Sequence, residues 1–145
     1  MRRMLGLLAG IILLMTSTTA LASCTTSATT LAFGNVTFST VNSTSTVTVN
    51  CTRSASFTVT LSTGNGGSFS PRQMSSGTNH LNYNIYADSA RTQIWGSGAS
   101  GTVANSGSTP NGGGTVNFTA YGQVPAQSSA APGSYTDTIT VTVTY

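Results

Sequence analysis

Polar and apolar residues alternate in several short segments of this 145-residue chain, and the clearest alternation is at the C-terminal end. Apolar side chains stand at Ile139, Val141, Val143 and Tyr145, with threonines between them. Successive side chains of a β-strand point to opposite faces, so the pattern predicts a strand over 135–145 with one buried face. Because most chains fray at their ends, this strand suggests that its end or its unpaired edge pairs with another chain.

The same period of two recurs upstream. It predicts strands at 46–51, 57–61, 81–87 and 115–120, with a weaker strand at 29–38 and a short one at 92–95. Segments rich in Gly, Asn, Ser and Pro lie between them and are typical of turns and loops. After residue 22 no segment shows sustained helical periodicity. The pattern predicts an all-β fold, an antiparallel β-sandwich.

The first residues predict a secretory signal peptide, residues 1–22. Two arginines precede an apolar run over 5–15, and the sequence Ala-Leu-Ala at 20–22, with a small residue at each end, suits cleavage. The apolar run is too short to span a membrane comfortably. We therefore expect export to the periplasm and cell surface, and a single folded domain over 23–145.

Two cysteines, Cys24 and Cys51, follow the expected cleavage site. In an oxidising compartment they most simply form one disulfide, which would close a loop of about two dozen residues and stabilise by roughly 3 kcal/mol. Two alternatives stay open at this point. The sequence Leu-Ala-Ser-Cys at 21–24 also fits a bacterial lipobox, in which Cys24 would carry a lipid, and the two thiols could be unrelated.

Charged residues are scarce, with five Lys or Arg and two Asp or Glu in the whole chain. Without the signal peptide, three arginines face two aspartates, so the expected domain carries a net charge near +1. Such a chain lacks the basic surface of a nucleic-acid-binding protein. A neutral surface rich in hydroxyl groups offers little charge repulsion, which suits a protein that assembles.

Catalytic groups are equally sparse. His80 is the only histidine, no serine sits in a nucleophile elbow, and the two aspartates are far apart in sequence. One histidine and a pair of cysteines do not make a metal site. We expect no enzymatic activity, no cofactor, no metal and no small-molecule substrate.

One tryptophan and three arginines are the remaining side chains that could contact a ligand. Trp95 stands beside Gly96 and could stack on a sugar or anchor a partner, although a core position is the commoner role for a lone tryptophan. Arg53, Arg72 and Arg91 are expected to be solvated or to hold loops in place.

A series of short motifs then resembles one family, the spore coat protein U domain, which is also the subunit domain of archaic chaperone–usher pili. The motifs begin at Cys24 and extend to the C-terminal strand. In order they are 31–35 (LAFGN), 47–52 (VTVNCT), 57–62 (FTVTLS), 71–74 (PRQM), 81–86 (LNYNIY), 94–96 (IWG), 121–125 (YGQVP) and 132–137 (PGSYTD).

The resemblance implies an immunoglobulin-like sandwich that lacks one strand. The gap exposes an apolar groove beside the C-terminal strand, lined by Ile139, Val141, Val143 and Tyr145. A periplasmic pilus chaperone fills the groove first, and a segment of the neighbouring pilin subunit replaces it at the outer-membrane usher. The implied function is a non-enzymatic subunit of a surface pilus, with roles in adhesion and biofilm.

One departure from the family pattern matters. Polymerising subunits carry a donor segment before the first cysteine, whereas cleavage after Ala22 would leave only Ser23 there. We therefore expect a terminal or tip subunit, which accepts a strand and donates none. The alternatives are a structural protein of a spore or cell coat and a small carbohydrate-binding module.

Overall fold

The computed structural model describes residues 21–36, 39–128 and 130–145. The expected signal peptide therefore lies almost entirely outside the described residues. The elements are eight strands: β1 (Cys24–Ala28), β2 (Val41–Cys51), β3 (Ala55–Leu61), β4 (Arg72–Ser76), β5 (Asn79–Tyr86), β6 (Asn105–Thr109), β7 (Gly114–Val124) and β8 (Val141–Thr144). Within these ranges there is no helix with the length and apolarity to cross a membrane.

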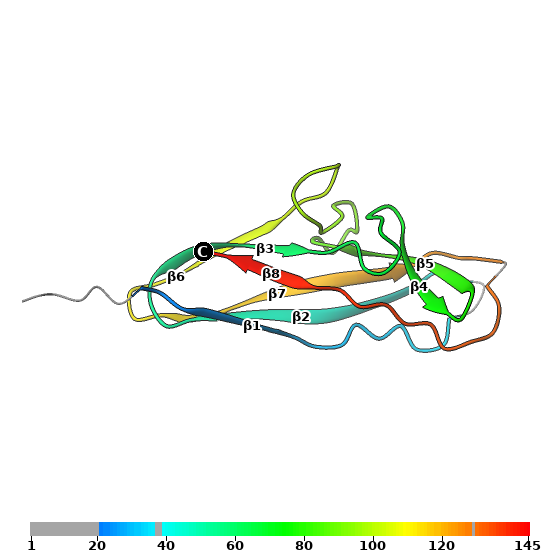
Figure 1. Cartoon of the computed structure of the whole chain (residues 1–145), viewed down its shortest axis with the longest axis horizontal. Coiled ribbons are helices and arrows are strands. Elements are labelled where there is room, and N and C mark those ends of the chain that lie inside the picture. The colour runs from blue at the N-terminus through cyan, green and yellow to red at the C-terminus, as the bar shows by residue number, and fades with distance from the viewer. Residues whose placement is uncertain (1–20, 37–38, 129) are drawn as a thin grey trace, which may run out of the picture.

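The strands form two sheets that face each other. One sheet has the order β1-β2-β7-β5-β4 and the other β6-β3-β8, and every pairing is antiparallel. Figure 1 shows the long strands β2 and β7 on one side of an elongated body and β3 with β8 on the other. The prediction of an all-β antiparallel sandwich is confirmed.

The core lies between the sheets because alternate residues of each strand point inward. In β3, Phe57, Val59 and Leu61 are buried while the residues between them are more exposed. In β2, Val47 and Val49 do the same. Phe57 and Phe118 pack edge to face in the middle, with ring centroids 6.2 Å apart. An aromatic pair in this geometry adds about 1 kcal/mol to the stability gained from burial alone.

Trp95 belongs to this core, which is the commoner of the two roles expected for it, and its burial contradicts the other role, contact with a ligand. The side chain is 0% exposed. Its indole N–H donates to the carbonyl of Val59 at 2.9 Å, and its ring meets Phe118 edge to face. A ring that is fully enclosed cannot stack on a sugar.

Arg72 was expected to be solvated or to hold loops in place, and it is fully buried at the start of β4. Its guanidinium donates to the carbonyls of Ser62 and Trp95 and to Oδ1 of Asn84, at 2.8–3.1 Å. It thus ties together the segments after β3 and β5. Of the two expected roles, holding loops in place is the one that Arg72 has.

The strands differ from the sequence prediction at several points. Segments 29–36 and 92–95 do not form strands, although Ile94 and Trp95 make isolated bridges. Strands β1, β4 and β6 were not predicted, because their apolar and polar residues do not alternate. The C-terminal strand is shorter than predicted, since regular pairing begins only at Val141.

Candidate functional site

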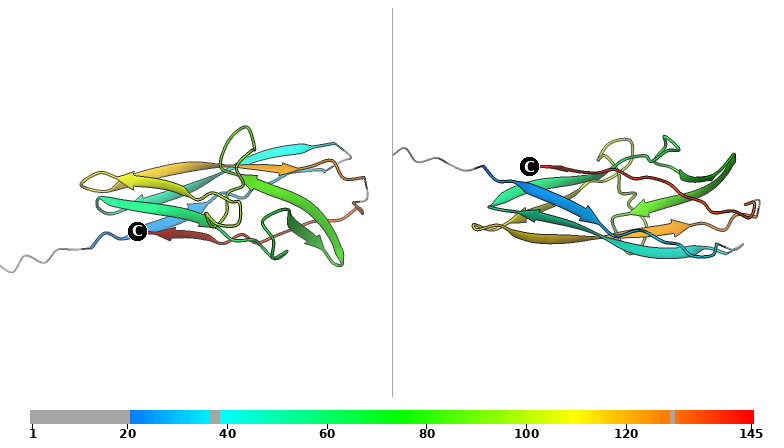
Figure 2. Two further views of the ribbon diagram at one scale, coloured as in Figure 1. Left: turned by 90° about the horizontal axis from the view of Figure 1, so that it is seen from above. Right: turned by 60° about the horizontal axis from the view of Figure 1, so that its bottom comes forward.

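The candidate site begins from two sheet edges on one side of the sandwich. β1 is the outer strand of the five-stranded sheet, and β8 is the outer strand of the other. The C-terminal segment and β1 run along this same side (Figure 2). In the described part of the chain no further strand pairs with either edge. The sandwich is therefore open here between its two sheets.

The hydrogen bonds of the C-terminal segment show which of its backbone N–H and C=O groups have no partner strand. The N–H of Ser62 donates to the carbonyl of Thr140 at 3.0 Å, and Ser75 and Thr136 exchange two bonds. In an antiparallel ladder such pairs alternate, so Thr142 and Thr144 also direct their N–H and C=O toward β3. The backbone groups of the odd-numbered residues, Val141 and Val143 among them, then face the open edge.

A cleft of about 1120 Å³ occupies the opening. One wall is the segment 28–36, which continues from β1, and the other is formed by 130–137 with Ile139 and Val141. Its floor consists of core residues of the two sheets. The apolar side chains around it are Val47, Leu61, Met74, Leu81, Tyr83, Ile85, Leu31, Phe33, Val36, Tyr135, Ile139 and Val141.

The wall formed by 28–36 is attached to the five-stranded sheet only at intervals. Thr29 exchanges hydrogen bonds with Thr46, and the hydroxyl of Ser43 donates to the carbonyl of Ala32 at 2.6 Å. Leu31 and Phe33 pack onto β7 at Gly122. A Cβ added there would come within 2.8 Å of both the Leu31 side chain and the Phe33 ring. Glycine at this position lets the wall lie close to the sheet.

One end of the cleft is polar. The hydroxyl of Tyr83 donates to Oδ2 of Asp137 at 2.6 Å, and Oδ1 of Asp137 accepts from the N–H of Asn65 at 2.7 Å. Burial, helped by the hydrogen bond and charge of Asp137, raises the pKa of Tyr83 far above its usual value. Burial lowers the pKa of Arg72 nearby, and the charges of Tyr83 and Asp137 oppose that shift. Tyr83 therefore stays neutral and acts as a donor.

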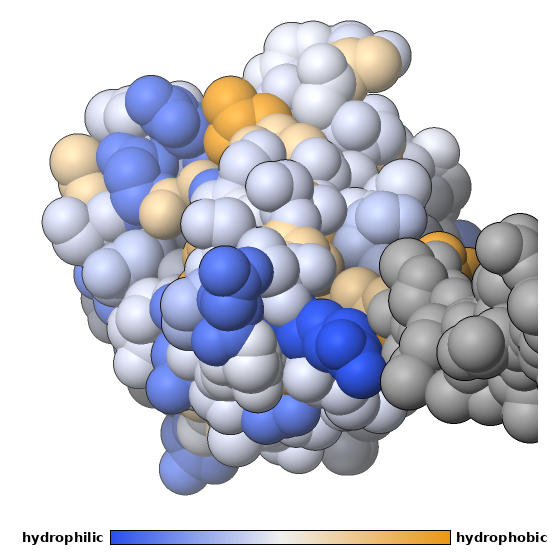
Figure 3. Space-filling view, turned by 90° about the vertical axis from the view of Figure 1, so that its left-hand side faces the viewer, coloured by the Kyte–Doolittle hydropathy of each residue, from blue (hydrophilic) through white to orange (hydrophobic). Residues whose placement is uncertain are grey.

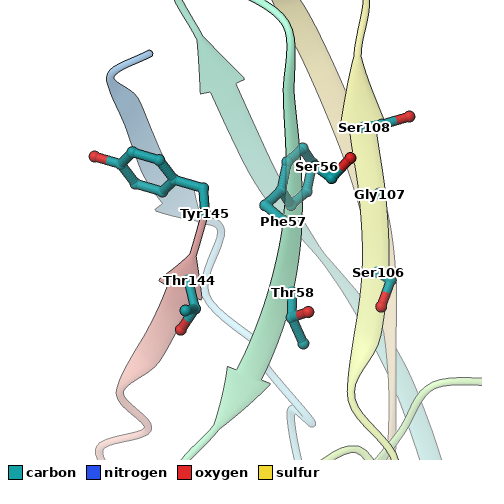
Figure 4. A pocket seen from close by; sticks show the side chains of 8 residues that line it. All are labelled: Ser56, Phe57, Thr58, Ser106, Gly107, Ser108, Thr144 and Tyr145. Carbon is teal, nitrogen blue, oxygen red and sulfur yellow. The ribbon is translucent and has the colours of Figure 1, made fainter. Parts of the chain in front are cut away.

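The structure places the four predicted groove residues in two different surroundings. Ile139 and Val141 line the cleft, and both are partly buried. Val143 pairs with Val59 and packs against the core outside the cleft lining. Tyr145 is 58% exposed and lines a shallow hollow with β3 and β6 (Figure 4). Val143 and Tyr145 therefore lie outside the lining of this cleft, and their place at the edge of a strand-accepting groove stays a prediction.

The hollow beside Tyr145 offers hydroxyl groups and little else. It is bounded by residues 56–58, 106–108 and 144–145, with Gly107 between two serines (Figure 4). The end of the molecule that carries the C-terminus shows mainly weakly polar surface with small separate apolar patches (Figure 3). Neither observation gives this hollow a chemistry of its own.

Cys24 and Cys51 are joined by a disulfide between opposite residues of β1 and β2. Ser23 is held beside it, since its carbonyl accepts from the N–H of Thr52 at 2.9 Å. The bond fixes the first strand to the sheet just ahead of the cleft wall.

Other candidate chemistry stays isolated. His80 lies on β5, and its Nδ1 is 3.1 Å from the hydroxyl of Ser75 on β4. Among the described residues there is no group of three or more His, Cys, Asp or Glu that could hold a metal ion. The cleft therefore offers apolar surface and free backbone groups as its means of binding.

Sequence reasoning missed the first wall of the cleft. Leu31, Phe33 and Val36 were expected in a weak strand, and their role in an opening was not foreseen. The signal was present in the irregular spacing of apolar residues over 31–36, which does not suit a fully paired strand.

Comparisons with known proteins agree with this architecture. A family model, the Spore Coat Protein U domain, matches residues 11–142. No curated protein matches the chain. Among solved structures it is similar to one chain of the CsuC–CsuE chaperone–tip adhesion subunit pre-assembly complex from the archaic chaperone–usher Csu pili of Acinetobacter baumannii. The TM-score is 0.66 and the identity 23%, over 86% of this chain and 40% of that chain.

The structural likeness shows the fold, and this chain spans 40% of the length of the chain that it matches. The family match is broader, because it covers most of the sequence and includes both cysteines, the cleft walls and the first half of β8. The chain therefore belongs to the spore coat protein U domain family.

Proposed function

We propose that this protein is a subunit of a chaperone–usher surface pilus, and that its cleft accepts a β-strand from another protein. A periplasmic chaperone would supply the strand first, and a neighbouring subunit would supply it after transfer at the outer-membrane usher. The family match and the fold shared with a chaperone–tip subunit complex support this proposal. The function is assembly rather than catalysis.

The observation that carries the proposal is the opening between β8 and the segment 28–36. It combines a free row of backbone N–H and C=O groups with an apolar cleft directly beside them. An added strand satisfies both, because its backbone pairs with the edge while alternate side chains fill the cleft. An uncovered edge of this kind is also a template for aggregation, which gives a chaperone a reason to cover it.

Capture by the chaperone tests the proposal with two substitutions on neighbouring residues of β8. Val141→Asp places a charge in the cleft, whereas Thr142→Asp places the same charge on the exposed face. The two variants would be co-expressed with a tagged periplasmic chaperone of the chaperone–usher class, and the amount of captured subunit would be measured.

We expect Val141→Asp to lose capture at least about tenfold, since an unpaired buried charge costs several kcal/mol. Thr142→Asp should be captured like the wild type. Val141→Thr nearly preserves the side-chain volume. Its capture by the chaperone therefore still tests the cleft if the aspartate variant is degraded. Equal capture of all variants, or a wild-type protein that never binds the chaperone, would overturn the proposal.

A terminal position in the fibre is a finer proposal that depends on processing after Ala22. With that cleavage, Ser23 would be the only residue ahead of the disulfide-bonded Cys24. N-terminal sequencing of the exported protein tests it directly. A mature chain that starts well before Ser23 would carry a segment available for donation and would remove the reason for a terminal placement.

A further inference from the structure

A group of aromatic and polar side chains lies on the outer face of the five-stranded sheet, away from the cleft. Tyr86 on β5 and Tyr121 on β7 are direct register partners. Ile85 and Gly122, their neighbours in sequence, are buried on the inner side, so both tyrosines face outward, where they are partly exposed. Neither ring lines the cleft.

Arg91 completes this aromatic surface. Its guanidinium carbon lies 5.9 Å from the centre of the Tyr121 ring, a cation–π arrangement. Its Nε donates to the carbonyl of Gly122 at 3.3 Å and Nη1 to that of Ser89 at 3.2 Å. Both partners are neutral, and the described residues include no acidic side chain in an ion pair with Arg91. Arg91 thus makes no ion pair with the described residues and has further N–H groups available.

The loop that carries Arg91 is built to hold it in place. Arg91 has a φ of +57°, a left-handed conformation that is uncommon for a residue with a long side chain. The Asp88 carboxylate accepts hydrogen bonds from the backbone N–H groups of Thr92 and Gln93 and from the hydroxyl of Thr92. Strain of this kind persists only where the surroundings enforce it, and it concentrates at binding sites.

Neutral polar groups border the two rings. Thr44 is the register partner of Tyr121 on its other side, and the amide of Gln123 donates to Asn42 Oδ1 at 3.0 Å. These amides and hydroxyls can both donate and accept hydrogen bonds. The surface therefore combines an aromatic ring, one unpaired cation and several groups that match sugar hydroxyls.

We propose that this surface, formed by Tyr86, Tyr121, Arg91, Asn42, Thr44 and Gln123, binds a carboxylated sugar residue of an acidic polysaccharide. The guanidinium of Arg91 would receive the carboxylate in a charge-assisted pair. The apolar face of the sugar ring would lie on Tyr86, and the amides would contact its hydroxyls. A single cation flanked by neutral groups suits one carboxylate per sugar, whereas a polyphosphate or nucleic acid needs a cluster of positive charges. The site does not depend on the proposed strand acceptance.

Oligogalacturonate is a suitable probe, and its fully methyl-esterified form is the matched control because it lacks only the negative charge. Binding to the exported protein, with its chaperone if one is bound, would be measured by biolayer interferometry. Arg91→Asn removes the cation and keeps a residue that tolerates a left-handed φ. Arg53→Asn removes the same charge at an exposed position outside the proposed site.

We expect saturable binding of oligogalacturonate that weakens at least tenfold on esterification and at least tenfold in Arg91→Asn. Arg53→Asn should bind within twofold of the wild type. Tyr86→Leu should weaken binding at least fivefold and Tyr86→Phe less than twofold, with thermal unfolding to verify that each variant is folded. Equal losses in Arg53→Asn and Arg91→Asn would show non-specific charge attraction, and that result or absence of saturable binding would overturn the proposal.

Discussion

Tyr83 and Asp137 are joined at the polar end of the cleft by a hydrogen bond of 2.6 Å from the phenolic hydroxyl to Oδ2. Tyr83 belongs to β5 in one sheet, and Asp137 precedes β8 in the other. Asp137 also accepts from the N–H of Asn65 in the loop after β3. The bond therefore fixes the direction in which the C-terminal segment leaves the polar end of the cleft.

This bond predicts a loss of stability at alkaline pH. The pKa of Tyr83 is raised in the folded protein, first by burial and then by Asp137. A raised pKa stabilises the fold fully below the unfolded-state pKa, near 10 for tyrosine, and that stability is lost as pH rises above it. We expect the free energy of unfolding to fall between about pH 9.5 and 11 more steeply in the wild type than in Tyr83→Phe. The free energy of unfolding would be measured by denaturant titration at each pH. The same pH dependence in the two proteins would contradict this role of Tyr83.

Two glycines with similar backbone conformations allow the cost of backbone strain to be measured separately from the cost of a steric collision. Gly34 and Gly64 both have positive φ, at +64° and +73°. A Cβ at Gly34 meets nothing within 4 Å, whereas a Cβ at Gly64 would collide with the carboxylate of Asp137. Gly34→Ala should cost about 1 kcal/mol and Gly64→Ala about 2–5 kcal/mol. Urea unfolding measures both, and equal costs would mean that Asp137 moves aside freely.

Arg72 should be essential for stability because its guanidinium is buried and satisfies several polar groups of the fold. Arg72→Met leaves the carbonyls of Ser62 and Trp95 without their guanidinium donor inside the fold. Buried polar groups left unsatisfied cost about 1–3 kcal/mol each. We expect a loss of roughly 3 kcal/mol or more, against less than about 0.5 kcal/mol for Arg53→Met at an exposed site. Similar unfolding midpoints for the two variants would contradict this role.

The disulfide should control the yield of exported protein. Cys51→Ser removes the bond between β1 and β2, and such bonds in small secreted domains are worth about 2–5 kcal/mol. We expect a periplasmic yield several-fold below that of the wild type. The double variant that also carries Cys24→Ser should give the same lowered yield. An intact mass two hydrogens below the reduced chain verifies the bond in the wild type. Unchanged yield in Cys51→Ser would favour a lipid on Cys24 instead.

The sandwich could be predicted because strands with one buried face carry a local signal. The alternation of valines and threonines in β2, β3 and β8 shows both the strand and its inner face. β4 and β6 carry no such signal, since Arg72 occupies an inward position and Gly107 leaves room for Phe57. Their place in the fold depends on partners far away in sequence.

Only the wall of the cleft formed by the C-terminal segment could be predicted, for a related reason. Val141 shows its inner face through local alternation, but where the opening begins depends on how β1 and the segment after Ala28 approach β8. That approach is set by Gly122, which admits Leu31 and Phe33, and by scattered hydrogen bonds such as Ser43 to Ala32. Periodicity within one strand contains no information about such contacts.

Amide hydrogen exchange along β8 tests most directly the claim that its outer edge awaits a strand. In the protein without a bound partner, the N–H of Thr142 faces β3 and should be protected, while those of Val141 and Val143 should exchange at least about tenfold faster. On binding the chaperone, Val141 and Val143 should become protected and Thr142 should change little. Equal protection of all three amides in the unbound protein would contradict the open edge and the proposed function with it.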